Sequence, residues 1–196
     1  HFSVMDADGM VVSVTASIDS YFGARVASPS LGFFYNNYMQ SFDLEPGRPF
    51  SLKPRGMAYS SMSSTIVTRD SNPVLVLGSP GSERIISTVA QVISHWVDAG
   101  AGIEAAVDAP RVHVAVDAED GRDNAYLEGP IEGVDPGRLG LDLSTASDAY
   151  IQRDRNAYFG GVHALALEMS GWVGAADPRR DGVVGYEDVR AESIGD

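Results

Sequence analysis

A glycine-rich turn is the part of the sequence best suited to chemistry. It runs from Gly78 to Arg84 as Gly-Ser-Pro-Gly-Ser-Glu-Arg, after an apolar strand pattern and before the longest helical pattern. Small residues at such a junction leave backbone N–H groups free at a helix N-terminus, where they bind anions or a developing oxyanion. No Lys follows the glycines, so this is not a Walker-type phosphate loop. Taken alone, such a turn is more often a plain connection.

Two hydroxyl residues form a second candidate. Thr15 and Ser17 lie two positions apart on an expected strand, so their side chains share a face of the sheet. Taken alone they are ordinary strand residues.

Other constellations are weaker. The histidines are scattered and none forms a metal-ligand pair at helical spacing, and His95 adjoins an apolar helix face, which favours a structural role. The acidic segments 6–9 and 117–121 lack the glycine position of a calcium loop. No Gly-x-Ser-x-Gly elbow presents a serine to a Ser-His-Asp triad. The sequence therefore predicts no metal site and no cofactor.

The expected elements follow from hydrophobic periodicity. β-branched residues on both sides of Asp8-Gly9 predict a hairpin over residues 2–18, whose first half would be a central strand of the sheet. Apolar positions at helical spacing predict a helix from Ser82 to Gly100. Further patterns predict a buried strand at 31–35, a loop at 43–56, a hairpin of 64–68 with 74–77, a helix at 103–108, strands at 112–116 and 125–127, a weakly patterned stretch at 129–155, a hairpin of 161–167 with 172–175, and a frayed acidic tail after Tyr186.

Composition limits the class of protein. The chain has 196 residues, 44% of them hydrophobic, which predicts one domain over residues 1–196. Its net charge of −13 argues against nucleic acid or an anionic membrane as a partner. It has no cysteine, which excludes disulfides and thiolate metal sites. No apolar run approaches the roughly 20 residues of a membrane span.

The order of several motifs resembles one enzyme family. The stretch from His1 to Thr15 is followed by Ser20-Tyr-Phe-Gly23, Asn36-Asn37, Ser60-Ser-Met-Ser63, Gly78-Ser-Pro-Gly81 and Asp177-Pro-Arg179. From end to end this resembles the small subunit of the gamma-glutamyltranspeptidases. The resemblance implies an α+β fold, an αββα sandwich of the N-terminal-nucleophile hydrolase type, completed by a separate large subunit cut from the same precursor. The residues Phe33–Phe42 and Phe159–Val162 look more like the poly-gamma-glutamate depolymerase branch, and the family also includes cephalosporin acylases.

The resemblance also implies a mechanism. The nucleophile is a Thr two positions before His1, freed by self-cleavage, so we expect two more residues ahead of His1 in the mature subunit. Gly81 and Ser82 match two glycines that form the oxyanion hole. Ser17 matches a Thr whose hydroxyl bonds the nucleophile, and Thr15 lies on the same face.

Substrate contacts are implied in the same way. Ser60 and Ser61 match the pair that holds the α-carboxylate of a gamma-glutamyl substrate. At the α-amino end the family uses an Asn, a Gln or Glu, and an Asp, where this chain has Asp19, Tyr38 and Ser41. Either Asp19 supplies the missing charge or the substrate lacks a free amine. A short loop from Asp43 to Tyr59 favours water over a bound amine acceptor.

The expected function is hydrolysis or transfer of a gamma-glutamyl or related acyl group from a small or peptide-like amide. The alternative is an inactive relative that only binds a ligand. The large subunit would cover apolar surface, for which the helix face ending at Trp96 is one candidate. The resemblance favours a periplasmic or extracellular location over a cytoplasmic one.

Overall fold

The computed structural model describes residues 1–116, 123–128 and 155–186. The second calcium-like segment, most of the weakly patterned stretch and the acidic tail lie outside these residues. Among those described, no helix is both long and apolar enough to cross a membrane.

A four-stranded antiparallel sheet forms the centre of the molecule. Its order is β10-β9-β6-β5, and its strands are β5 (Thr65–Arg69), β6 (Asn72–Gly78), β9 (His163–Glu168) and β10 (Gly171–Ala176). Both predicted hairpins are confirmed. The run Val74–Leu77 is buried, as expected for a strand covered on both faces.

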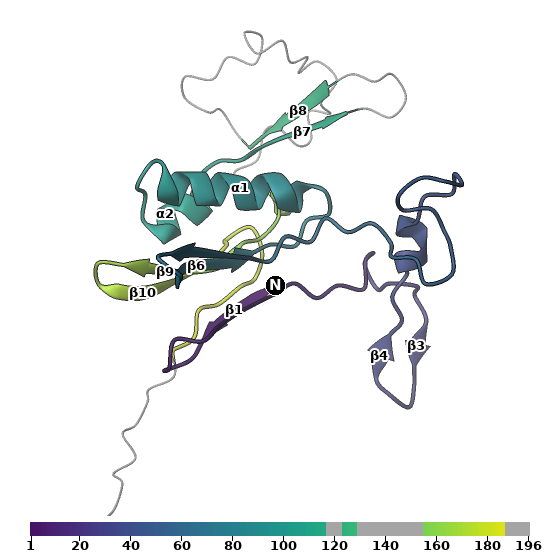
Figure 1. Cartoon of the computed structure of the whole chain (residues 1–196), viewed down its shortest axis with the longest axis horizontal. Coiled ribbons are helices and arrows are strands. Elements are labelled where there is room, and N and C mark those ends of the chain that lie inside the picture. Colours follow the sequence, from purple (N-terminus) through teal and green to yellow (C-terminus); the bar gives the residue numbers. More distant parts are fainter. Residues whose placement is uncertain (117–122, 129–154, 187–196) are drawn as a thin grey trace, which may run out of the picture.

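Two helices cover one face of this sheet, as Figure 1 shows. They are α1 (Arg84–Val97) and α2 (Ile103–Asp108), and they confirm the predicted helices. The apolar side of α1 packs Ile85, Val89 and Val92 into the core, with Trp96 partly buried beside them. This side is therefore filled by the chain's own sheet, and the expectation that it faces a second subunit is wrong.

The N-terminal hairpin lies on the opposite face of the sheet (Figure 1). Among the described residues, its strands β1 (Phe2–Met5) and β2 (Val11–Val14) pair with each other and not with the four-stranded sheet, so in this part of the chain β1 is not a central strand as expected. Ser13 donates a hydrogen bond of 3.0 Å to the carbonyl of Leu77, which fixes the hairpin on β6. Apolar side chains point away from the sheet and are exposed: Phe2, Val4 and Val12.

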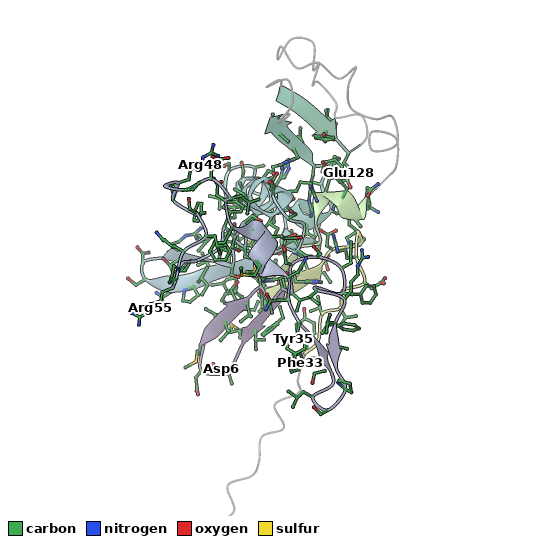
Figure 2. All side chains as sticks on the ribbon, turned by 90° about the vertical axis from the view of Figure 1, so that its right-hand side faces the viewer. Asp6, Phe33, Tyr35, Arg48, Arg55 and Glu128 are labelled. Atoms are coloured by element: carbon green, nitrogen blue, oxygen red, sulfur yellow. The ribbon has the colours of Figure 1, made fainter. Side chains whose placement is uncertain are left out.

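A small arm projects from the body and is formed by β3 (Ala27–Ser28) and β4 (Phe33–Phe34). The strand predicted at 31–35 is present as β4, but its predicted burial is wrong, because Phe33 and Phe34 are 46% and 44% exposed. Their rings pack within the arm instead, edge to face, Phe33 against Tyr35 and Phe34 against Phe22. Figure 2 shows Phe33 and Tyr35 on this arm.

A two-stranded ribbon lies on the far side of α1 (Figure 1). It pairs β7 (Val112–Val116) with β8 (Asp123–Leu127), which confirms the two predicted strands. Gln91 of α1 holds its start by accepting from the Val112 amide at 2.9 Å and donating to the Val112 carbonyl at 2.8 Å. The described residues also include the short 3-10 helices η1 (Tyr38–Ser41) and η4 (Ala157–Phe159).

A buried ion cluster joins the segments that border α2. Arg111 and Asp177 pair at 2.6 Å, and Arg179 pairs with both Asp177 and Glu128. Arg179 also donates to the carbonyls of Val107 and Ala109 at the end of α2. Burial alone would raise the pKa of Asp177, but Arg111, Arg179 and two main-chain amides hold that pKa below its ordinary value.

Candidate active site

The predicted site residues gather where several strand ends meet. Antiparallel pairing places Thr65, which begins β5, beside Leu77 near the end of β6. The imidazole of His1, just before β1, lies against Gly78. A Cβ atom on Gly78 would come within 2.4 Å of that ring, so a larger residue there requires the ring to move. The N-terminal hairpin and the glycine-rich turn are therefore brought together.

The turn between β6 and α1 has an unusual backbone. Gly81 has φ of +135° and Ser82 has φ of +58°, so the serine adopts the left-handed conformation that glycine reaches more readily. Within the described part of the chain, neither the Gly81 nor the Ser82 amide donates a hydrogen bond. Both N–H groups stand just before α1, where the helix dipole favours negative charge.

The serine segment predicted to bind a carboxylate touches this turn. Ser61 donates a hydrogen bond of 2.8 Å from its hydroxyl to the Ser82 carbonyl. Ser63 in turn donates to the Ser61 carbonyl at 2.9 Å, and Ser60 accepts from the Met62 amide at 3.3 Å. The structure thus joins two groups of residues that lie about twenty positions apart in the sequence.

A chain of hydroxyls fixes the His1 ring. Ser64 donates to Thr15 at 3.0 Å, and Thr15 lies 2.8 Å from His1 Nδ1. On the other side His1 Nε2 lies 3.1 Å from Ser3, whose hydroxyl donates to the main-chain carbonyls of Val76 and His163 at 3.4 Å each. If each hydroxyl donates once, Thr15 donates to Nδ1 and Ser3 accepts from Nε2–H. The tautomer with its proton on Nε2 fits this arrangement of donors and acceptors.

The predicted amino-binding residues are only partly assembled. Asp19 has φ of +76°, and its amide donates to the Ser17 hydroxyl at 2.8 Å. Its carboxylate accepts a 2.6 Å hydrogen bond from Gln40 Nε2. Tyr38 and Ser41 lie on η1, but the Tyr38 hydroxyl contacts Met62 instead, and the carbonyl of Ser41 accepts from Tyr59.

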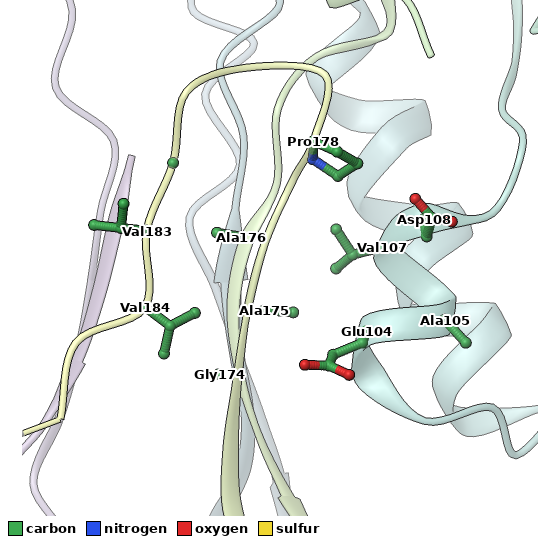
Figure 3. Close-up of a pocket in the computed structure, with 11 residues that line it drawn as sticks. Glu104, Ala105, Val107, Asp108, Gly174, Ala175, Ala176, Pro178, Val183 and Val184 are labelled. Atoms are coloured by element: carbon green, nitrogen blue, oxygen red, sulfur yellow. The ribbon is translucent and has the colours of Figure 1, made fainter. Parts of the chain in front are cut away.

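Two cavities lie away from these residues. One of about 530 Å³ opens between α2 and the segment 182–184, with Glu104, Val107 and Pro178 on its wall (Figure 3). Another of about 640 Å³ lies near Trp96 and Leu167. Neither of these two cavities is lined by a predicted site residue.

A serine and a histidine also meet outside this region. Ser87 of α1 lies 2.9 Å from Nδ1 of His113 on β7, and burial together with the charge of Arg84 lowers the pKa of His113. No carboxylate bonds the other nitrogen of His113 among the residues described. The pair therefore lacks the orienting acid of a catalytic triad. No cluster of three or more metal-ligating side chains occurs in this part of the chain either.

Comparison with known families decides the identity. A sequence profile described as gamma-glutamyltranspeptidase matches residues 1–186. The chain belongs to this family. The chain is 42% identical to the glutathione hydrolase proenzyme of Bacillus subtilis subsp. natto over 58% of its length and 19% of the relative. It is 34% identical to the acylase ACY 1 proenzyme of Pseudomonas sp. strain V22 over 93% of its length and 31% of the relative.

A solved gamma-glutamyltranspeptidase shares the fold. The enzyme from Pseudomonas nitroreducens in complex with L-DON matches with a TM-score of 0.76 and 31% identity, over 95% of this chain and 98% of that chain. The expected α+β architecture of the N-terminal-nucleophile hydrolase type is thereby confirmed. The chain spans only a fifth to a third of the length of the curated relatives above.

Sequence reasoning missed four residues at the site. Gln40, which holds Asp19, and Ser64, which bonds Thr15, carry no motif of their own. His1 was dismissed with the other histidines. Ser79 was noted only as part of the glycine-rich turn, although it is fully buried beneath it. For Ser79, the only available signal in the sequence was its position between two glycines of the turn.

Proposed function

We propose that the whole protein, of which this chain is one part, hydrolyses gamma-glutamyl or related amides through an N-terminal Thr located two positions before His1. The Thr hydroxyl attacks the amide carbonyl while its own α-amine takes the proton. The amine leaving group departs with that proton, and water then releases the acyl group and regenerates the hydroxyl. Transfer to an amine is the minor outcome.

The observation that carries this proposal is the turn before α1. The Gly81 and Ser82 amides have no partner within the described residues, and they sit at a helix N-terminus. Two such donors are suited to the charge that develops on the carbonyl oxygen during attack. Since the donors belong to the backbone, the serine side chain does not prevent this role.

The surroundings of the expected nucleophile support the same reaction. His1 is held by Thr15 and by Gly78, so the chain that precedes it starts from a fixed point. Thr15 and Ser17 both lie beyond the end of β2, so the expectation that they share a strand face is wrong, but Ser17 keeps a hydroxyl, which accepts from the Asp19 amide. We assign Ser17 the hydrogen bond to the nucleophile.

Different residues would bind the α-carboxylate and the α-ammonium of the substrate. Ser60 and Ser61 bind the α-carboxylate, adjacent to Ser82. Asp19 binds the α-ammonium, with Gln40 holding one of its oxygens and leaving the other to the substrate. We favour this alternative over a substrate without an amine, because the Gln40 contact pre-orients the carboxylate.

The partner would be the large subunit from the same precursor. The relatives are named proenzymes, and the exposed apolar face of β1–β2 offers a surface for the remainder of the sandwich.

A substrate comparison tests the proposed function. The assembled protein is assayed with a gamma-glutamyl anilide and its N-acylated counterpart, each with and without glycylglycine. We expect release of aniline from the free-amine substrate that glycylglycine barely accelerates. Absence of cleavage for both substrates would support the inactive alternative, and transfer outpacing hydrolysis would refute the bias toward water.

A further inference from the structure

The hydroxyl of Ser79 connects two distant segments beneath the glycine-rich turn. Ser79 follows β6 directly and is 0% exposed. Its Oγ accepts from the Gly161 amide at 3.0 Å and donates to the Pro80 carbonyl at 2.6 Å. One hydroxyl therefore satisfies a buried donor and a carbonyl at once, and it has a single orientation in which it can do so.

Close backbone packing surrounds this hydroxyl. Gly160 has φ of +90°, and a Cβ atom there would lie 2.5 Å from Ser79 Oγ and 2.9 Å from the Pro80 oxygen. A Cβ atom on Gly81 would lie 3.0 Å from the Cα of Gly160. The turn and the Gly160–Gly161 segment are in direct contact, and neither can move without the other.

The Gly160–Gly161 segment is itself held on both sides. The carbonyl of Phe159 accepts from Thr88 Oγ1 at 2.9 Å and from Arg111 at 2.8 Å. The amide of Val162 donates to Asp177 at 2.8 Å, and Asp177 is paired with Arg111. The buried ion cluster thus supplies a fixed base against which Ser79 rests.

The contact with Pro80 controls a neighbouring N–H group. The Pro80 carbonyl and the Gly81 amide belong to one planar trans peptide unit, in which the C=O and N–H bonds point in opposite directions. Holding the oxygen inward at Ser79 therefore turns the Gly81 N–H outward, away from the buried side of the turn.

We propose that Ser79 is a positioning residue that aims the Gly81 amide at the developing oxyanion. This rests on the oxyanion role of Gly81 and Ser82 in the proposed function. Ser79 itself touches no reacting atom. Without its hydroxyl, the Pro80–Gly81 peptide can rotate, and the buried Gly161 amide loses its acceptor.

The test compares Ser79→Ala with Thr88→Val in the assembled enzyme. Both variants delete one buried hydroxyl from the same packed region, so both should lower Tm. Loss of a whole oxyanion donor costs about 10² to 10³ in kcat; for a misaimed donor we expect kcat to fall about tenfold to hundredfold with KM unchanged. Thr88→Val should keep the wild-type kcat, because Arg111 still holds the Phe159 carbonyl.

Four results would each decide against part of this account. Equal kcat losses in the two variants, or a wild-type kcat in Ser79→Ala, would overturn the positioning role. If Ser79→Ala does not assemble, Ser79→Cys, whose thiol is a weak donor and acceptor, decides: we expect a lowered kcat at unchanged KM, and an unchanged kcat refutes the role. A wild-type enzyme that cleaves no gamma-glutamyl anilide would instead refute the proposed function.

Discussion

Hydroxyls and glycines, rather than strongly charged groups, organise the candidate site. Thr15, Ser61 and Ser79 each bond a different part of the strand ends that converge there. Motif order in the sequence identified Ser61 and Thr15, because their positions match a family pattern. Ser79 and Gln40 could not be found in this way, since their importance depends on segments that only folding brings into contact.

A substitution at Asp19 tests the assigned amine contact. Asp19→Asn removes the negative charge but keeps the shape, so a charge-assisted hydrogen bond to the substrate ammonium is lost. We expect kcat/KM for a gamma-glutamyl anilide to fall roughly thirtyfold, about 2 kcal/mol. The exposed Asp8→Asn at the hairpin turn is the matched control and should keep full activity. Wild-type kcat/KM in Asp19→Asn would show that this carboxylate does not bind the amine.

At the scale of elements, periodicity predicted most of the fold. The alternating and helical patterns located β5, β6, α1, α2 and the β9–β10 hairpin, because each buries a face with a regular repeat. The aromatic run at 31–35 gave a wrong prediction of burial, because its rings pack in pairs on an exposed arm. The position of the β1–β2 hairpin against the main sheet depends on side-chain hydrogen bonds to β6. Hydrophobic periodicity does not encode such bonds.

A substitution at Gly78 tests whether its contact with the His1 ring positions the N-terminal hairpin. Gly78→Ala places a methyl group within 2.4 Å of the His1 ring, so the ring must shift, and we expect the residues ahead of His1 to shift with it. We expect kcat to fall about tenfold or more, since small displacements at a nucleophile are costly. Gly185→Ala is the control, because nothing lies within 4 Å of a Cβ at Gly185. Equal activity of the two variants would show that the His1 contact does not set the geometry.

At the scale of the molecule, the chain leaves one side of its sandwich uncovered. Phe2 and Val4 of the β1–β2 hairpin are 52% and 50% exposed, whereas the helices cover the opposite face of the main sheet. The prediction of one domain over residues 1–196 stays a prediction. The uncovered face could not be located from the sequence. The hydrophobic pattern of β1 is the same whether one or both faces of the strand are buried.

Assembly with the large subunit should depend on this face. Val4→Lys in the full precursor places a charge where we expect apolar contact, and it should weaken subunit association about tenfold or more. Val183→Lys, at a residue 90% exposed on another segment, is the control. Size-exclusion chromatography over a dilution series measures the effect. Unchanged association of Val4→Lys would place the large subunit elsewhere.

Acid should destabilise the assembled protein through two histidines. Burial lowers the pKa of His113 and of His163 below the ordinary value of 6.5. Because the unfolded chain then binds protons more readily, stability is complete above about pH 6.5 and is lost progressively as the pH falls below it. Urea unfolding at several pH values should show this decline, with a shallower slope in His113→Gln. An identical slope in that variant would contradict the assignment.

The central claim is an N-terminal nucleophile, and one measurement tests it most directly. The assembled protein is treated with an electrophilic glutamine analogue, and the small subunit is then examined by intact-mass and peptide mass spectrometry. We predict a single adduct on a Thr that is the first residue of the subunit, two positions before His1. A mature subunit that begins at His1, or an adduct on an internal residue such as Ser87, would contradict the mechanism.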